Sequence, residues 1–214
     1  MFFFEKEAWD KQFKFVAGVD EAGRGPLAGP VVAAAMIIPK GIDFPLVNDS
    51  KKLTDKQRRK LSAQITSIDN LDYSIVEISE QEVDNINILN ATHMAMKKAI
   101  LNLRNVDFAL IDGLPVPNFP IDCKSIVKGD SKSASIAAAS ILAKVYRDDL
   151  MIDFSVRYPQ YGFEKHKGYG TAQHIKAIKK FGPCPIHRRT FAPISILYPI
   201  NIPDTVQHEL NLFS

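Results

Sequence analysis

Cysteine is scarce in this sequence, and so are long apolar runs. The 214 residues contain two cysteines, Cys123 and Cys184, which lie far apart and in no C-x-x-C pair. A zinc framework and a disulfide scaffold therefore have no support, and a reducing cytoplasm is the expected location. No apolar stretch approaches the ~20 residues of a membrane span, and the opening MFFFEKEAWDK is neither a signal peptide nor an anchor. We expect no membrane association.

A large excess of charge of one sign is absent as well. The chain has 27 Lys and Arg against 24 Asp and Glu, a net charge of +3. This balance permits nucleic-acid binding but does not indicate it, because binding requires a clustered basic patch. With 46% hydrophobic residues, the composition is that of an ordinary globular protein. We predict a single domain over residues 1–214 and expect a monomer.

The most informative stretch is GVDEAGRGPLAGP, residues 18–30. An apolar run over residues 13–19 predicts a buried strand that delivers two adjacent carboxylates, Asp20 and Glu21. Burying unpaired carboxylates costs several kcal/mol each, so a divalent cation with oxygen ligands is the expected partner. The following Gly23, Arg24 and Gly25 would let the backbone approach a ligand while a guanidinium reaches an anion. A tight turn with an internal salt bridge is the alternative.

Apolar periodicity predicts alternating strands and helices. Strands are expected at 13–20, 28–38, 72–78, 108–111 and 124–127, and helices at 55–68, from 79 or 80 to about 103, 131–151 and 171–181. Thr54 is a good N-cap for the first of these helices, and clustered asparagines at 85–90 predict a break in the second. This alternation favours one layered α/β structure.

Acidic residues follow three of the predicted strands. Asp20 with Glu21 follows the first, Asp112 the fourth and Asp130 the fifth. Ligands collect at the carboxyl ends of strands in α/β sheets, and carboxylates brought together there repel unless cations bridge them. Oxygen ligands favour two Mg²⁺ or Mn²⁺ ions about 3.5–4 Å apart over zinc. On the residues alone, Asp112 as a turn residue and Asp130 as a helix N-cap remain alternatives.

Basic and hydroxyl side chains are placed to meet phosphates. They come from the loop before the helix at 55–68 and from one stripe of the alanine-rich helix, where a solvated face is the alternative. The first group is Asn48, Ser50 and Lys51 with Lys52, and the second is Ser140, Lys144 and Arg147. A third basic cluster, 187–189, has exposed surface charge as its alternative.

Tyr169 lies between two glycines in HKGYGT, residues 166–171. Small neighbours would leave its ring free to stack on a sugar or base, and its hydroxyl could bond a 2′-OH. A loop tyrosine that packs on the core is the alternative interpretation.

Taken in order, these blocks resemble ribonuclease HII, the type 2 ribonuclease H family. The matching strings are GVDEAGRGPLAGP, DSKKL, IDG, KGD, SIAAASILAKVYRD, HKGYGT and HRRTF, spread over about residues 13–193. The resemblance implies a ribonuclease H-like α/β fold, with a mixed five-stranded sheet and helices on both faces. We expect the first three strands to be antiparallel. Residues from about 194 to 214 would form a C-terminal extension.

The resemblance also implies an activity. Such an enzyme hydrolyses the RNA strand of RNA–DNA hybrids and nicks 5′ of single ribonucleotides in duplex DNA, leaving a 3′-hydroxyl and a 5′-phosphate. The residues matching the family's metal ligands, which hold two Mg²⁺ or Mn²⁺ ions, are Asp20, Glu21, Asp112 and Asp130. Those matching its ribonucleotide-recognition residues are Gly23, Arg24, Gly25 and Tyr169. Asp107, Asp148 and Asp149 are then expected to be structural, paired with neighbours such as Arg147.

Two other functions compete with this one. A non-catalytic nucleic-acid-binding module on the same fold would be expected to have lost a metal carboxylate, and all four are present. A ribonuclease HIII-like enzyme would carry an extra N-terminal domain, whereas about a dozen residues precede the first predicted strand.

The end of the chain, ELNLFS, looks like a peptide that docks on a bacterial sliding clamp. Leu210, Leu212 and Phe213 would fill an apolar groove of that partner. Packing of this segment on its own domain is the alternative.

Overall fold

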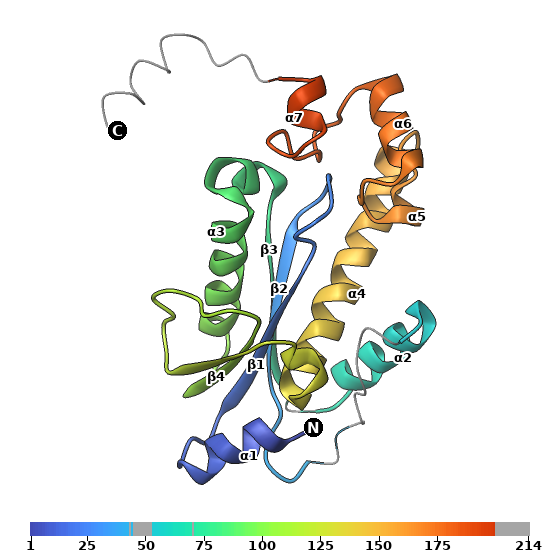
Figure 1. Cartoon of the computed structure of the whole chain (residues 1–214). Helices are drawn as coiled ribbons and strands as arrows, with labels where there is room; N and C mark the ends of the chain where they lie inside the picture. The colour runs from blue at the N-terminus through green and yellow to red at the C-terminus, as the bar shows by residue number, and fades with distance from the viewer. Residues whose placement is uncertain (43, 45–52, 70, 200–214) are drawn as a thin grey trace, which may run out of the picture.

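The computed structural model describes residues 1–42, 44, 53–69 and 71–199 of the chain. Within them, one mixed sheet has the strand order β3-β2-β1-β4-β5 (Figure 1). Its strands are β1 (Val16–Ala22), β2 (Val31–Ile37), β3 (Asp72–Ile78), β4 (Phe108–Asp112) and β5 (Cys123–Ile126). The first three strands pair antiparallel, and β4 and β5 run parallel to β1. The predicted mixed five-stranded sheet is confirmed.

Helices cover both faces of this sheet. α3 (Glu80–Leu101) packs on one face, and α4 (Ala134–Arg157) with α2 (Asp55–Thr66) packs on the other (Figure 1). Strand β2 serves both layers because successive side chains point to opposite faces. Val31, Ala33 and Ala35 join the core under α3, and Val32, Ala34 and Met36 join the core under α4. The smaller helices are α1 (Phe3–Asp10), α5 (Phe163–His166), α6 (Ala172–Phe181) and α7 (Ile194–Leu197).

Helix α4 lies unusually close to β1. A Cβ placed on Gly18 would lie 2.1 Å from the main-chain carbon of Ser135, so only glycine permits this contact. The alanine-rich sequence of the helix serves the same approach, since Ala137, Ala138 and Ala139 are fully buried. As a result, the amino-terminal half of α4 lies beside the strands that carry the predicted acidic residues.

Several local predictions are confirmed. Thr54 caps α2 in a capping box with Gln57, and α3 follows Ser79, which forms the same motif with Glu82. The break expected near residues 85–90 occurs at Asn87, whose φ of 63° and ψ of 163° interrupt the helix. These signals are local in the sequence, which explains why they could be predicted.

Other boundaries were wrong. Strand β1 begins at Val16 instead of Phe13, because the amides of Lys14 and Phe15 donate to the Asp107 carboxylate and not to a neighbouring strand. The strand also continues through Glu21 to Ala22. Helix α4 begins at Ala134 and not at residue 131, since Gly129–Ser131 form a 3₁₀ turn and Ser133 is the N-cap. It runs on to Arg157, six residues beyond the predicted end.

Helix α1 was not predicted, and it anchors the start of α4. Glu5 is fully buried, and its Oε1 accepts hydrogen bonds from the Ser133 hydroxyl at 2.6 Å and the Ser135 amide at 2.9 Å. A carboxylate at a helix N-terminus is favoured by the helix dipole. This contact fixes the end of α4 that follows Asp130.

At the other end of the chain, the predicted extension begins with α7, and residues 200–214 lie outside the described part. None of the described helices is long and apolar enough to cross a membrane.

Candidate active site

A cavity of about 410 Å³ opens where the carboxyl ends of β1 and β4 meet. These strands are parallel neighbours, with Val19 opposite Ile111, so their next residues, Asp20 and Asp112, reach the same edge. Glu21 lines the cavity as well. Three of the four predicted carboxylates therefore share one cavity.

Burial makes these carboxylates costly to ionise. The pKa of Asp20 is raised well above its usual range, first by burial and then by the charges of Glu21 and Asp112. A hydrogen bond from the Ser140 hydroxyl opposes this rise, as does the Glu21 amide, which donates to Asp20 Oδ1 at 2.7 Å. Burial also raises the pKa of Glu21, against the opposing charge of Arg24, whose Nη1 lies 3.4 Å from Glu21 Oε1. The site thus favours a proton or a cation.

Asp130 lies beside this cavity but does not line it. Its 3₁₀ turn is held to the site by Gly129, whose amide donates to Asp112 Oδ1 at 2.5 Å. Asp130 is 1% exposed and is not the N-cap of α4, because the Ser133 hydroxyl accepts from the Ile136 amide. The structure thus joins the turn that carries the fourth carboxylate to Asp112, while Asp130 itself is buried outside the cavity lining.

The donor set fits a hard divalent cation, which prefers carboxylate and hydroxyl oxygen. Among the residues that the structure describes, no three His, Cys, Asp or Glu side chains lie close enough to form a ready-made ligand cage. The site therefore fits a divalent cation by the chemistry of its ligands, by their burial and by the raised pKa of Asp20 and Glu21.

Basic and aromatic residues surround the acidic floor of the cavity. Predicted members that line it are Gly23, Arg24, Gly25, Ser140, Lys144 and Tyr169. Lys144 pairs with Asp148 at 2.6 Å on the same helix. Tyr169 is 46% exposed and lies over the glycine turn, since a Cβ on Gly25 would be 3.7 Å from its Cε1. Asn48, Ser50 and Lys51 lie outside the described residues.

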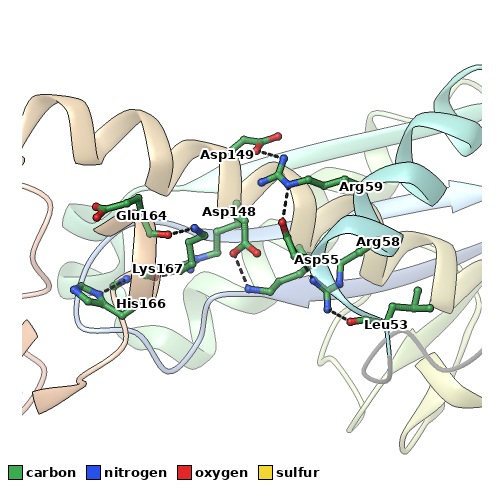
Figure 2. Close-up of polar contacts among 12 residues, drawn as sticks. Leu53, Asp55, Arg58, Arg59, Asp148, Asp149, Glu164, His166 and Lys167 are labelled. Atoms are coloured by element: carbon green, nitrogen blue, oxygen red, sulfur yellow. Dashed lines mark hydrogen bonds and ion pairs between the residues drawn. The ribbon is translucent and has the colours of Figure 1, made fainter. Parts of the chain in front are cut away.

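Arg58 of α2 lines the cavity and was not singled out from the sequence. Its neighbour Arg59 does not line the cavity and pairs with Asp149 at 2.5 Å and Asp55 at 3.0 Å, contacts that Figure 2 shows. Arg58 donates to the Leu53 carbonyl and lies 3.8 Å from Asp55. Both arginines belong to one polar run, DKQRRK, so only the packing of α2 against α4 distinguishes them.

The interpretation of three other basic residues was wrong. Arg147, His187 and Arg188 are each at most 1% exposed, so a solvated face and exposed surface charge are wrong for them, although Arg147 lines the cavity together with Ser140 and Lys144. Arg147 and Arg188 bond to main-chain carbonyls. Arg189 donates its amide to Asp84, which also accepts from Thr190.

The three aspartates expected to be structural have partners other than Arg147. Asp107 accepts from the amides of Lys14 and Phe15, at 2.7 and 2.9 Å. Asp148 pairs with Lys144, and Asp149 pairs with Arg59. Arg147 makes no ion pair with any described carboxylate.

Comparison with known proteins agrees with this fold. The family model described as Ribonuclease HII matches residues 17–194. Ribonuclease HII of Chlamydia caviae is 59% identical over 192 residues, covering 89% of this chain and 90% of the relative. That of Caldanaerobacter subterraneus is 55% identical, covering 89% and 79%. The crystal structure of ribonuclease H2 from Pyrococcus horikoshii superposes with a TM-score of 0.71 at 30% identity, covering 86% of this chain and 96% of the other.

The mixed sheet, with an acidic cavity at the carboxyl end of its central strand, defines a hydrolase of the ribonuclease H-like class. Within that class, the chain belongs to the ribonuclease HII family. The family is therefore HII, and the ribonuclease HIII-like alternative is set aside.

Proposed function

We propose that this chain is an endonuclease that hydrolyses the RNA strand of RNA–DNA hybrids. It would also nick duplex DNA on the 5′ side of a single embedded ribonucleotide, leaving a 3′-hydroxyl and a 5′-phosphate. The observation that carries the proposal is the cavity itself, which joins buried carboxylates to a basic rim and an exposed tyrosine. Family membership supports the same activity.

Asp20, Glu21, Asp112 and Asp130 would hold two Mg²⁺ or Mn²⁺ ions. When bound, such ions activate a water molecule and stabilise the leaving oxygen of a phosphodiester. The chain's part is to fix the ligands: the Ser140 hydroxyl bonds Asp20, and the Gly129 amide orients Asp112. The raised pKa of Asp20 supports cation binding, because a cation relieves the same repulsion as a proton does.

The basic rim would bind the phosphates on either side of the scissile bond. Arg24, Arg58 and Lys144 line the cavity, and the side chain of Arg24 is half exposed. Contacts of this type position a nucleic acid without reading its bases. On substrate binding, the Lys144 ammonium group would leave Asp148 for a phosphate or contact both groups at once.

The ribose would be read by Tyr169 and the Gly23–Gly25 turn. Among the described residues, the amides of Arg24 and Gly25 have no hydrogen-bond acceptor, and both residues line the cavity. An N–H group and a tyrosine hydroxyl can both bond a 2′-OH, which is the group that distinguishes RNA from DNA.

The direct test is cleavage of a labelled DNA duplex that contains one ribonucleotide, with Mg²⁺ or Mn²⁺, against an all-DNA control. The proposal predicts a nick 5′ of the ribonucleotide, absent from the control and abolished by a metal chelator. Binding without cleavage in either metal would contradict it and favour the non-catalytic module.

Other predictions concern parts of the chain beyond the described residues. Phosphate contact by Asn48, Ser50 and Lys51, and clamp binding through Leu210, Leu212 and Phe213, remain predictions. A pull-down with a purified sliding clamp tests the latter, and binding that survives deletion of residues 210–214 would exclude it. Action as a monomer in the cytoplasm also stays a prediction.

A further inference from the structure

The two segments proposed to read the ribose lie far apart in the sequence but against each other in the fold. The Leu27 amide donates to the Gly168 carbonyl at 2.8 Å. A Cβ on Gly168 would lie 2.5 Å from the Ala28 carbonyl oxygen, so glycine is required at this crossing. Tyr169 follows directly. Its position over the glycine turn therefore depends on whatever holds the two segments together.

Arg188 holds the glycine turn from inside the protein. Its side chain is fully buried and donates four hydrogen bonds to main-chain carbonyls. Nη2 bonds Gly23 at 2.6 Å, Nη1 bonds Arg24 at 2.9 Å and Pro26 at 3.0 Å, and Nε bonds Gly29 at 3.0 Å. With its carbonyls directed inward, the turn leaves the amides of Arg24 and Gly25 available to a ligand.

Arg147 joins the same turn to the tyrosine segment. It is 1% exposed and donates at 3.0 Å to the carbonyls of Ala28 and Pro30, which follow the glycine turn, and to the carbonyl of Lys167, two residues before Tyr169. Neither guanidinium forms an ion pair with a carboxylate in the described part of the chain. Burial lowers the pKa of Arg147 to about 10 and that of Arg188 to about 9. Carbonyl dipoles are what compensate these buried charges.

A relay of two imidazoles supports Tyr169 from the other side. His174 Nδ1 lies 2.9 Å from the Tyr169 carbonyl oxygen, and its Nε2 lies 3.0 Å from Nε2 of His187. His187 Nδ1 lies 2.9 Å from the Cys184 amide nitrogen, which donates to it, and 3.3 Å from the Cys184 carbonyl oxygen, so the amide contact is the stronger of the two. A carbonyl can only accept and an amide N–H only donate, so the protons are assigned along the relay. His174 carries its proton on Nδ1, His187 carries its proton on Nε2, and both rings are neutral.

We propose that Arg147, Arg188 and the His174–His187 pair are positioning residues that fix Tyr169 against the Gly23–Gly25 turn before substrate binds. They act through main-chain groups of the two segments. The inference rests on the proposed function, because this alignment matters only if the two segments read the ribose. A site held in place in advance loses less entropy when it binds its ligand.

Arg188→Lys tests the first half of the network, with Arg189→Lys as the matched control. Lysine keeps the positive charge but cannot reproduce the planar fork of four donors. Arg189 is the next residue, and among the described residues its guanidinium hydrogen-bonds only to the Tyr198 carbonyl, at 3.4 Å. The measurement is the ratio of affinities for a duplex with one ribonucleotide and an all-DNA duplex, without divalent metal. We expect this ratio to fall about tenfold in Arg188→Lys, which corresponds to the loss of about one hydrogen bond to a charged group. Arg189→Lys should keep the wild-type ratio.

His174→Leu and His174→Asn form a second pair, which decides the proposal if Arg188→Lys does not fold. Asparagine places an amide donor near the position of Nδ1 and can still reach the Tyr169 carbonyl, whereas leucine cannot. The affinity ratio should fall about fivefold in the leucine variant, as expected for one lost hydrogen bond, and survive in the asparagine variant. Nitrogen NMR of the wild-type side chains should show the proton on Nδ1 of His174 and on Nε2 of His187 at pH 7.

Each contrary result has a distinct meaning. Unchanged ribose preference in a folded Arg188→Lys or His174→Leu protein overturns the positioning role, and so do the opposite tautomers. If wild-type protein shows no ribose preference, the proposed ribose recognition fails first, and the positioning proposal fails with it. That outcome is visible before any variant is made.

Discussion

Two regions of this protein bury charge, and they treat it in opposite ways. At the carboxyl end of β1, burial and then the charges of Glu21 and Asp112 raise the pKa of Asp20, and no described cation neutralises it. Behind the glycine turn, Arg147 and Arg188 are just as buried, yet seven carbonyl contacts, three to one and four to the other, surround them. Burial and like charge favour a proton or a cation at Asp20 in the first region, whereas main-chain carbonyls satisfy the buried charges of the second.

This difference distinguishes residues that bind a ligand from residues that hold the main chain in place. A buried charge that the protein leaves in conflict marks a site where a ligand is expected. A buried charge whose donors are all satisfied holds the main chain in place instead. The sequence presents both kinds as short strings that contain charged residues, so only the contacts distinguish them.

Replacing one carboxylate should abolish turnover. Asp20→Asn removes a proposed metal ligand while keeping shape, so kcat should fall on the order of 10³-fold, equivalent to about 4 kcal/mol. The affinity for the duplex should change much less. Single-turnover cleavage and a binding titration on the same substrate measure both quantities. Cleavage at the wild-type rate would remove Asp20 from the mechanism.

The histidine relay should make stability depend on pH. Burial lowers the pKa of His174 and His187 from 6.5 to about 4, so the unfolded chain takes up protons that the folded protein refuses. Stability is therefore complete above pH 6.5 and is lost as the pH falls towards 4, by on the order of 3 kcal/mol per histidine. Urea unfolding at several pH values measures this loss. Subtracting the curve of His174→Asn isolates the relay, and a difference that does not vary with pH would contradict it.

The two glycines of the turn should respond differently to alanine. Gly23 has a φ of +93°, and a Cβ there would lie 2.0 Å from Arg147 Nε, so Gly23→Ala should destabilise the fold by about 2 kcal/mol or more. A Cβ on Gly25 meets only Tyr169, at 3.7 Å, so Gly25→Ala should keep the wild-type melting temperature. Thermal unfolding of the two variants measures this difference in stability. Equal destabilisation would contradict the claim that Gly23, and not Gly25, is tightly packed.

The neighbouring arginines of α2 supply the smallest effect. Arg58→Ala should raise KM for the duplex about tenfold, as expected for one lost contact with a charged group, with little change in kcat. Arg59→Ala removes only the exposed pairs with Asp55 and Asp149 and should leave KM within about twofold, since such pairs contribute little. Steady-state kinetics decide this, and equal effects would mean that Arg58 does not contact phosphate.

Local sequence signals predicted the framework well. Apolar alternation gave β3 with both bounds correct, and the caps at Thr54 and Ser79 were recognisable because a capping box lies within four residues. Asp20 and Asp112 could be placed at one edge because parallel strands must end together. These are properties of short segments or of the sheet as a whole.

The roles of the individual arginines could not be predicted from local sequence signals. Arg188 bonds a turn more than 150 residues earlier, and the sequence contains nothing local that distinguishes it from the partly buried arginine beside it. Arg58 and Arg59 pose the same problem within one helix. Whether a basic residue faces a phosphate, a carboxylate or a carbonyl depends on packing between distant elements, which a single sequence does not display.

The claim that the carboxylates of the cavity await a cation is tested most directly by the unfolding free energy. It should be measured for the wild-type protein and for Asp20→Asn, each with and without Mn²⁺. Without metal, Asp20→Asn should be the more stable of the two, because one buried charge and its repulsion are gone. Mn²⁺ at 100 times its Kd should stabilise the wild-type protein by about 2.7 kcal/mol and stabilise the variant far less. Identical unfolding curves with and without Mn²⁺ for the wild-type protein would contradict the central claim that these buried carboxylates are held ready for a cation.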